Sequence, residues 1–248
     1  MKRHIPNFLT LLNLLCGSIA VILVVNNNFV AASLFVFLGI FFDFFDGFVA
    51  RKLNVQSDLG IQLDSLADMV TSGLVPGLVM YKLLKLVAPS WQETVDGIGL
   101  EFASPEFYTI LPYFGLLITL ASAYRLAKFN IDEDQHDYFK GLPTPANTLF
   151  IISLPLIIEF QNSHVIDSLL LNTWFLIGVT LLSCYLLNSN LKLMALKFKD
   201  WRFSSNVFKY VLIGISIALL IVFKFIAIPV IILLYIVLSL LHKSFSVK

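Results

Sequence analysis

The sequence predicts an all-α fold, a polytopic integral membrane helix bundle with about eight transmembrane helices. Hydrophobic residues make up 58% of the 248 positions and charged residues only 13%, and the mean hydropathy is +0.87. Long apolar stretches with so few charges are typical of membrane-spanning chains and exclude an ordinary soluble domain. The net charge of +1 comes without any basic run that resembles a nucleic-acid footprint. We therefore expect the lipid bilayer, and no nucleic acid, as a partner.

Eight segments meet or approach the roughly 20 apolar residues that a transmembrane helix needs. They cover residues 8–25, 29–49, 60–82, 108–128, 145–160, 171–187, 207–223 and 226–241. The fifth, seventh and eighth are short or closely joined, so seven spans are the alternative. No internal repeat is visible, and we expect one domain over residues 1–248. Cys16 and Cys184 lie inside apolar segments, which predicts small core residues and neither a disulfide nor a zinc site.

The positive residues set the expected orientation, because Lys and Arg are enriched in cytoplasmic loops. With the N-terminus inside, only Lys82, Lys85 and Lys224 fall on the external side, and every other Lys and Arg falls on the cytoplasmic side. Residues 87–107 carry several acids and no Lys or Arg, and we interpret them as an external loop without chemistry. The chain is thus expected in the cytoplasmic (inner) membrane.

Four carboxylates are concentrated where the second and third predicted spans meet. Asp43 and Asp46 are three residues apart at the end of one span, and Asp64 and Asp68 are four apart at the start of the next. Residues three or four apart share a helix face, so each helix offers a pair. The short connection over residues 52–59 would fold the helices side by side and bring all four to one membrane depth.

Such a cluster calls for a cation. Carboxylates in or near hydrocarbon are costly, and four together repel one another unless positive charge neutralises them. All-oxygen ligands favour hard divalent ions, and a pair of such ions about 3.5–4 Å apart is a recurring device for displacement at phosphorus. A purely structural Asp cluster is the alternative.

The pattern D-x2-D-G-x2-A-R-x8-G-x3-D-x3-D runs without departure from Asp43 to Asp68. It resembles the signature of the CDP-alcohol phosphatidyltransferases. The resemblance implies two Mg2+ or Mn2+ ions on Asp43, Asp46, Asp64 and Asp68, with Asp68 also the catalytic base. It covers residues 5–150 well, which predicts a six-helix family core over about 5–190 and two extra C-terminal helices over about 207–241.

The resemblance also implies a binding site for CDP-diacylglycerol. Its expected residues are Asn7, Thr10, Gly47, Arg51, Ser57 and Gly60. Asn7, Thr10 and Asn13 share one face of the first helix, and the Pro-Asn-x2-Thr pattern there is similar to the family's nucleotide-lining motif; bonds between helices would also explain these residues. We expect Arg51 on a phosphate, Gly47 to admit the nucleotide, and Gly60 to let the third helix approach the second. Ser57 is either a nucleotide contact or an exposed loop serine.

The acceptor alcohol must be inferred from other segments. Tyr124–Asn130 (YRLAKFN) and Gly141–Ala146 (GLPTPA) resemble segments of the CDP-diacylglycerol–serine O-phosphatidyltransferases, with Lys128 in place of the usual Arg. The resemblance implies serine binding by Arg125, Lys128 and Asn130. The plainer alternative is two cations at a cytoplasmic helix end and a C-capping Asn.

Together these resemblances imply an enzyme that moves the phosphatidyl group of CDP-diacylglycerol to L-serine, giving phosphatidylserine and CMP. One alternative is the same reaction with glycerol 3-phosphate or an inositol phosphate. A more distant one is a cation transporter that uses the acids as an ion path. The sequence shows no dimer interface, although homodimers are common in families of this kind.

Overall fold

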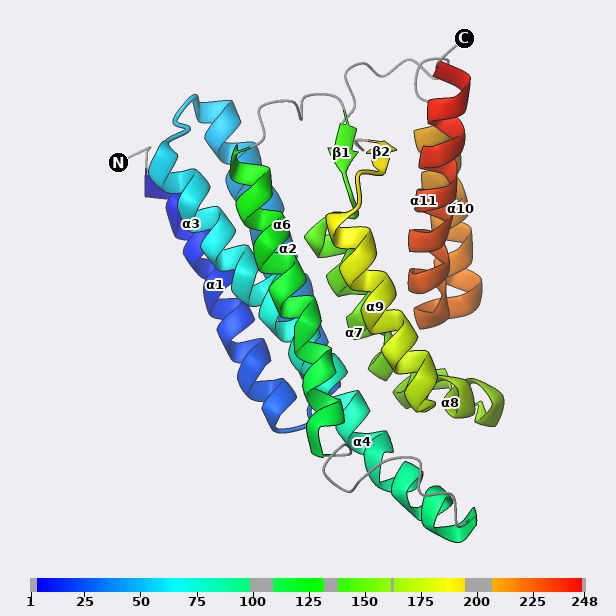
Figure 1. The fold of residues 1–248 in the computed structure, drawn as a ribbon. Coiled ribbons are helices and arrows are strands. Elements are labelled where there is room, and N and C mark those ends of the chain that lie inside the picture. The colour runs from blue at the N-terminus through cyan, green and yellow to red at the C-terminus, as the bar shows by residue number, and fades with distance from the viewer. Residues whose placement is uncertain (1–3, 99–108, 132–137, 162, 195–206, 247–248) are drawn as a thin grey trace.

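The computed structural model describes residues 4–98, 109–131, 138–161, 163–194 and 207–246 (Figure 1). Its first half contains α1 (His4–Val25), α2 (Phe29–Leu53), α3 (Asp58–Asp68), a π-helical segment η1 (Met69–Leu74), α4 (Val75–Ile98), a 3-10 segment η2 (Leu111–Leu116) and α6 (Leu117–Ile131). Its second half contains β1 (Tyr138–Lys140), α7 (Thr144–Gln161), α8 (His164–Leu170), α9 (Thr173–Asn188), β2 (Lys192–Met194), α10 (Val207–Phe223), η3 (Lys224–Ile226) and α11 (Ala227–Ser246).

The prediction of an all-α membrane bundle is confirmed. Each of the eight predicted apolar segments contains a helix, and within the described ranges four helical segments are long and apolar enough by themselves to cross a membrane. These are His4–Val25, Phe29–Leu53, Asp58–Ala88 and Tyr210–Leu241. The pair α8 and α9, bent by 60° at their junction, would add a fifth span.

Two parts of the chain differ from the expectation. Helix α4 continues to Ile98, past the point near residue 87 where we expected an external loop, and residues 99–108 of that loop lie outside the described residues. The short antiparallel pair β1–β2, in which Tyr138 faces Met194, was not predicted. Such a pair holds too few residues to show an alternating pattern.

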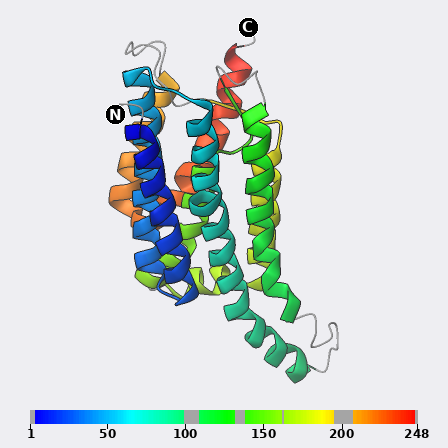
Figure 2. The same cartoon turned by 90° about the vertical axis from the view of Figure 1, so that its left-hand side faces the viewer.

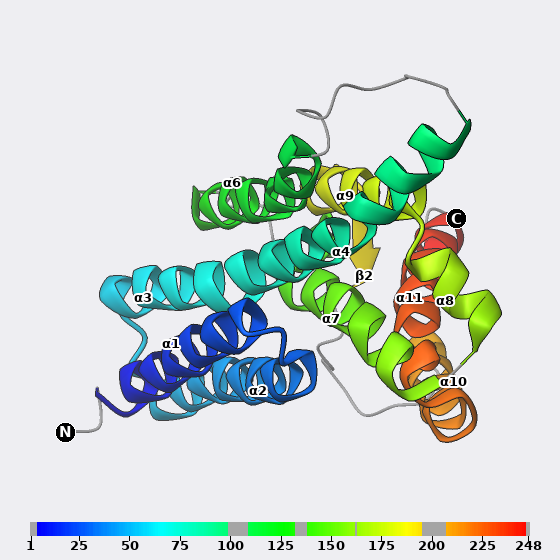
Figure 3. The same cartoon turned by 90° about the horizontal axis from the view of Figure 1, so that it is seen from below.

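The long rod α3–η1–α4 lies at the centre of the bundle. Viewed along the bundle, α1 and α2 lie on one side of this rod and α6 on the other, with α7 and α9 beside its α4 part (Figure 3). Its lower end projects beyond the neighbouring helices (Figure 2). The main apolar core forms around α4, where Val79, Met80, Leu83 and Leu84 are all buried.

The C-terminal hairpin attaches through a smaller, separate apolar cluster. Leu142 and Leu193 meet Leu212, Ile232 and Tyr235 there, and the Tyr235 hydroxyl donates to the Met194 carbonyl at 3.0 Å. The start of α1, the α2–α3 connection, the β1–β2 pair and the end of α11 all lie at the same end of the bundle (Figure 1). Two of the motif carboxylates lie just before that connection in the sequence and two just after it, so they also belong to this end.

Helices α1 and α2 and segment η1 meet closely at Thr71. This residue is fully buried, and its hydroxyl donates to the Asn13 carbonyl at 3.2 Å. A Cβ on Gly17 would overlap the Thr71 hydroxyl and lie 3.0 Å from its backbone nitrogen, and one on Gly39 would lie 2.8 Å from its Cγ2. The two glycines therefore fix how closely α1 and α2 approach the rod, one turn from Asp68.

We predict that Gly17→Ala destabilises the protein by about 1–3 kcal/mol, because the new methyl group meets backbone atoms that cannot rotate away. Gly178→Ala in α9 is the matched control, since a Cβ there has nothing within 4 Å. Thermal unfolding in detergent, followed by circular dichroism, measures both. Equal melting temperatures for the two variants would contradict the close contact at Thr71.

Candidate active site

Three carboxylates converge at the end of the bundle that holds the α2–α3 connection. Asp43 and Asp46 come from α2 and Asp64 from α3, and one ligand oxygen from each lies within 4.8 Å of the other two. Asp46 is only 5% exposed, and Asp43 and Asp64 are half-buried. The helical spacing that the sequence shows thus brings carboxylates from two helices to one point.

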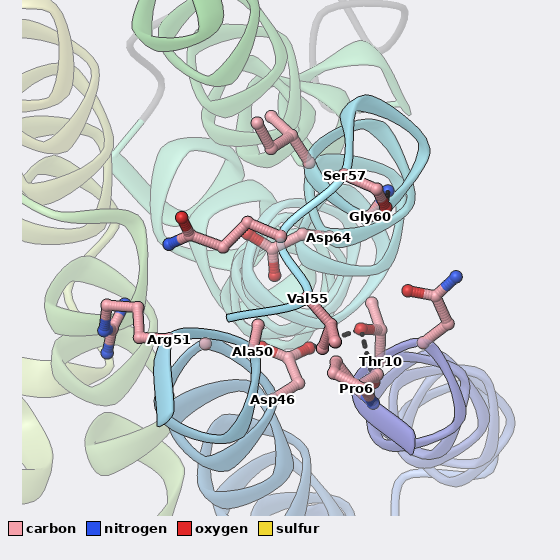
Figure 4. A pocket seen from close by; sticks show the side chains of 13 residues that line it. Pro6, Thr10, Asp46, Ala50, Arg51, Val55, Ser57, Gly60 and Asp64 are labelled. Carbon is pink, nitrogen blue, oxygen red and sulfur yellow. Dashed lines mark hydrogen bonds between the residues drawn. The ribbon is translucent and has the colours of Figure 1, made fainter. Parts of the chain in front are cut away.

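Helix α1 orients the carboxylates with neutral polar groups. The Thr10 hydroxyl donates to Asp46 Oδ2 at 2.5 Å, and it also lies 3.1 Å from the Pro6 carbonyl (Figure 4). Asn13 Nδ2 donates to Asp68 Oδ1 at 3.3 Å. Thr10 and Asn13 therefore do make the bonds between helices that formed the alternative explanation for this polar face, and their partners are the motif acids themselves.

Asp68 is not one of the three closely grouped acids, although it interacts electrostatically with Asp43. It follows Asp64 by one turn of α3 and interacts electrostatically with Arg125 of α6 as well as with Asp64. The structure therefore brings together three of the four predicted metal ligands and places the fourth deeper along the rod.

The close group has the donor set of a metal site. Its ligands are all oxygens, as hard divalent cations prefer. Asp64 Oδ1 is buried and has no hydrogen-bond partner among the described residues. An orphaned buried oxygen beside two further carboxylates is costly unless a cation occupies the space between them. The cluster can thus bind a metal ion.

A cavity of about 180 Å³ opens beside these acids, between α1, α2 and the start of α3 (Figure 4). Its lining includes all six residues that we expected at the donor: Asn7, Thr10, Gly47, Arg51, Ser57 and Gly60. Five further residues line it: Pro6 and Ala50 belong to the two sequence patterns but were given no role, and Val55, Gln56 and Ile61 were not singled out. Pro6, Ala50, Val55 and Ile61 have small or apolar side chains that indicate no chemistry, and the polar Gln56 occupies no fixed position of either sequence pattern, so only their positions beside the motif residues could have suggested them.

Local chain chemistry shapes the rim of this cavity. Asn54 ends α2 in a left-handed conformation at φ 53°, and Ser57 caps α3 by accepting a bond from the Gly60 amide at 3.1 Å. Ser57 is thus a helix cap that also faces the cavity. The space where Gly47 lacks a side chain is bordered by the Arg51 guanidinium, 3.2 Å from a Cβ position.

The expectation for Gly60 was wrong in its partner. A Cβ on Gly60 would meet Ser57 Oγ at 3.2 Å and Asn7 Oδ1 at 3.4 Å, so this glycine lets α3 approach α1 and not α2. The reason is that α1 packs extensively against both α2 and α3, so a side chain of α1 reaches Gly60.

The three residues expected at the acceptor are spread over different surroundings. Arg125 is 8% exposed and lies near Asp68, with Nη1 3.4 Å from Thr144 Oγ1. Lys128 lines a small cleft with Arg125 and Asn188. Asn130 joins α6 to α3, because its amide donates to Ser65 Oγ at 2.9 Å; it lies in the last turn of α6 and not at a C-cap. None of the three lines the 180 Å³ cavity.

A second, larger cavity is almost entirely apolar. It has about 580 Å³ and lies between α2, α7 and the hairpin of α10 and α11. Its lining consists of Phe37, Leu149, Leu220, Lys224, Phe225, Ile228, Ile231 and Ile232.

Comparisons with known proteins bear on this geometry. Residues 3–185 match the family described as CDP-alcohol phosphatidyltransferase. The chain belongs to this family. Membership makes it an enzyme and removes the transporter hypothesis. The matched residues end within α9, so α10 and α11 lie outside them.

Named relatives narrow the comparison. The chain is similar to a CDP-diacylglycerol–serine O-phosphatidyltransferase of Bacillus subtilis, 36% identical over 61% of this chain and 75% of the relative. It is also similar to one of Methanocaldococcus jannaschii, 32% identical over 72% of this chain and 71% of the relative. An archaetidylserine synthase of Methanothermobacter thermautotrophicus is 29% identical over 60% of this chain and 56% of the relative.

We predict that Asp43→Asn and Asp64→Asn each abolish tight binding of Mn2+, because each removes a charge from a group of three. Asp58→Asn is the matched control: Asp58 is exposed in the first turn of α3. Electron paramagnetic resonance of Mn2+ titrated into the purified protein without substrate measures binding directly. Undiminished Mn2+ binding by both cluster variants would rule out the site.

Proposed function

We propose that this enzyme transfers the phosphatidyl group of CDP-diacylglycerol to L-serine, giving phosphatidylserine and CMP. The observation that carries the proposal is the site itself: a three-carboxylate cluster beside a cavity of about 180 Å³, with a buried arginine next to Asp68. The names of the first two relatives give serine as the acceptor, and the name of the third gives a serine lipid as the product.

The donor head group fits the polar cavity. The cytidine and its diphosphate would lie along Asn7, Gly47 and Ser57, with the Arg51 guanidinium on a phosphate oxygen. Asp43, Asp46 and Asp64, with Asp68 alongside, would hold two Mg2+ or Mn2+ ions. Such ions neutralise the diphosphate and stabilise charge that develops on its oxygens.

The chemical step is a displacement at the lipid-side phosphorus. A bond forms from the serine hydroxyl oxygen to this phosphorus, and the bond from phosphorus to the oxygen shared with CMP breaks. CMP leaves with that oxygen and its electron pair. Asp68 accepts the hydroxyl proton, and Asn13 holds its carboxylate in place from α1.

The acyl chains of the donor require an apolar seat. The 580 Å³ cavity has one wall in α2, at Phe37, about 9 Å along the helix from Asp43 at 1.5 Å per residue. The chains lie there, and the C-terminal hairpin thereby contributes to donor binding although it falls outside the matched residues.

The site lies at the cytoplasmic face in this proposal. The α2–α3 connection, which carries Arg51 and Lys52, shares one end of the bundle with β1 and β2, which carry Lys140 and Lys192 (Figure 1). Since Lys and Arg are enriched in cytoplasmic segments, these residues support a cytoplasmic position for that end and for the start of α1.

The decisive experiment measures CMP release from CDP-diacylglycerol in detergent with Mg2+ or Mn2+, in parallel reactions with L-serine, glycerol 3-phosphate and an inositol phosphate. We expect release with L-serine, reduced about 10²–10⁴-fold in Asp68→Asn because the base is lost. Release with a phosphorylated alcohol alone would keep the metal site and discard the acceptor.

The apolar cavity gives a second prediction. Ile228→Trp fills it and should raise KM roughly tenfold for a donor with long acyl chains, equivalent to about 1.4 kcal/mol, while a dioctanoyl donor is affected less. Val230→Trp is the control, because Val230 is 42% exposed and does not line the cavity. Equal KM changes for the long and short donors would place the chains elsewhere.

A further inference from the structure

Behind Asp68, away from the donor cavity, three elements bury polar side chains that lack partners. Among the described residues, Ser72 Oγ of η1, Ser122 Oγ and Arg125 Nε of α6, and both amide atoms of Asn147 on α7 make no hydrogen bond. Ser72 and Asn147 are 1% exposed and Ser122 is fully buried. A buried polar group without a partner costs roughly 1–3 kcal/mol, so a concentration of them requires a reason.

These groups belong to surfaces that touch. The Thr148 hydroxyl donates to the Ser72 carbonyl at 2.9 Å, which fixes α7 against η1. A Cβ on Gly73 would lie 3.2 Å from the Ser122 Cβ, which fixes α6 against η1 from its other side.

Two further contacts tie the cluster to the acid. Arg125 of α6 contacts Thr144 of α7 at 3.4 Å, so α6 and α7 also touch each other directly. Thr144 lies one turn of α7 before Asn147. Asp68 lies one turn before Ser72 and interacts with Arg125, so the cluster adjoins the proposed base.

Asn147 is the clearest member of the cluster. A side-chain amide offers two donor hydrogens and an acceptor oxygen, and here none of them is used within the described part of the chain. It shares the buried face of α7 with Thr144, Thr148 and Ile151, so it points into the bundle and not toward lipid.

We infer that Asn147, with Arg125, forms the subsite for the amino-acid part of the acceptor. The inference rests on the proposed function and extends it to a residue outside the predicted site. L-serine carries three polar groups on adjacent carbons, and the cluster offers a partner for each. Asp68 would take the hydroxyl, Arg125 the carboxylate, and the side-chain amide oxygen of Asn147 the ammonium. Ser72 and Ser122 add neutral donors or acceptors around the same point. Asn130, bonded to Ser65, has no part in this subsite.

The chemistry separates serine from the other acceptors. An alcohol that carries a phosphate dianion and no ammonium would leave the Asn147 carbonyl oxygen unused and would place two negative charges against a single buried guanidinium. A site built to bind an ammonium discriminates strongly against an analogue that lacks it, because its buried acceptor then stays unpaired.

The test replaces Asn147 with leucine, which has a similar volume and no polar atoms. If Asn147 binds serine, Asn147→Leu raises KM for L-serine about tenfold or more and leaves KM for CDP-diacylglycerol within twofold. The melting temperature of the unliganded protein should stay the same or rise, because an unpaired buried amide is removed. Ser122→Ala, a smaller change in the same cluster, should also raise KM for serine.

Inhibition by serine analogues identifies the group that is bound. In the unaltered enzyme, 3-hydroxypropionate, which lacks the ammonium, should compete with L-serine far more weakly than D-serine does. Asn147→Leu should bring the KM for L-serine closer to the inhibition constant of 3-hydroxypropionate. Arg125→Gln should instead bring the KM for L-serine closer to the inhibition constant of ethanolamine, which lacks the carboxylate.

The failures are distinguishable. An unaltered enzyme that releases no CMP with L-serine overturns the proposed function itself. An enzyme that does so normally, with Asn147→Leu and Ser122→Ala both leaving KM for serine unchanged or lowering only kcat, overturns the subsite alone. A fall in the Asn147→Leu melting temperature with no change in KM also overturns it, since Asn147 would then be a packing residue.

Discussion

Mutual repulsion of carboxylates governs how the polar end of this bundle is built. Three of them lie within 4.8 Å of one another, at the end of an otherwise apolar bundle. At that separation each charged pair costs on the order of 3 kcal/mol, even with strong screening. The adjoining helix α1 offers only a hydroxyl at Thr10 and an amide at Asn13. Neutral donors can orient the oxygens but cannot balance their charge, and Arg51 and Arg125 bring only two positive charges to four carboxylates. The protein leaves the rest of the balancing charge to something it binds.

The sequence allowed the near part of the site to be predicted because that part obeys local rules. Helical spacing assigns Asp43 with Asp46, and Asp64 with Asp68, to shared faces, and a short connection forces the two faces to one depth. The polar face of the first helix reaches the same depth for the same reason. It was therefore possible to predict, without any knowledge of tertiary packing, that residues such as Asn7, Arg51 and Ser57 lie together; they line one cavity.

The remainder depends on pairs far apart in the sequence, which periodicity does not encode. Gly60 meets Asn7 of α1, and Asn130 of α6 meets Ser65 of α3. The unpaired amide of Asn147 is visible only once α7 packs on η1, because in the sequence it is one polar residue in the first turns of an apolar helix. Lone polar residues of that kind are common, and only burial without a partner sets this one apart.

Segment η1 changes the rotation of the central rod about its axis, so the faces of α3 and α4 are not in register as they would be in one continuous α-helix. A π-turn holds one residue more than an α-turn, and each residue of a regular helix advances the chain by about 100°. Asp64 and Asp68 therefore face α1 and α2 above η1, while below it Gly77 can face Thr119 of α6. Losing one residue within 69–74 would leave an unbroken helix, yet it would turn either the acids or the packing face away from its partners. The irregular turn thus sets the rotation of the acidic face relative to the packing face. This requirement constrains the length of the segment more strictly than its composition.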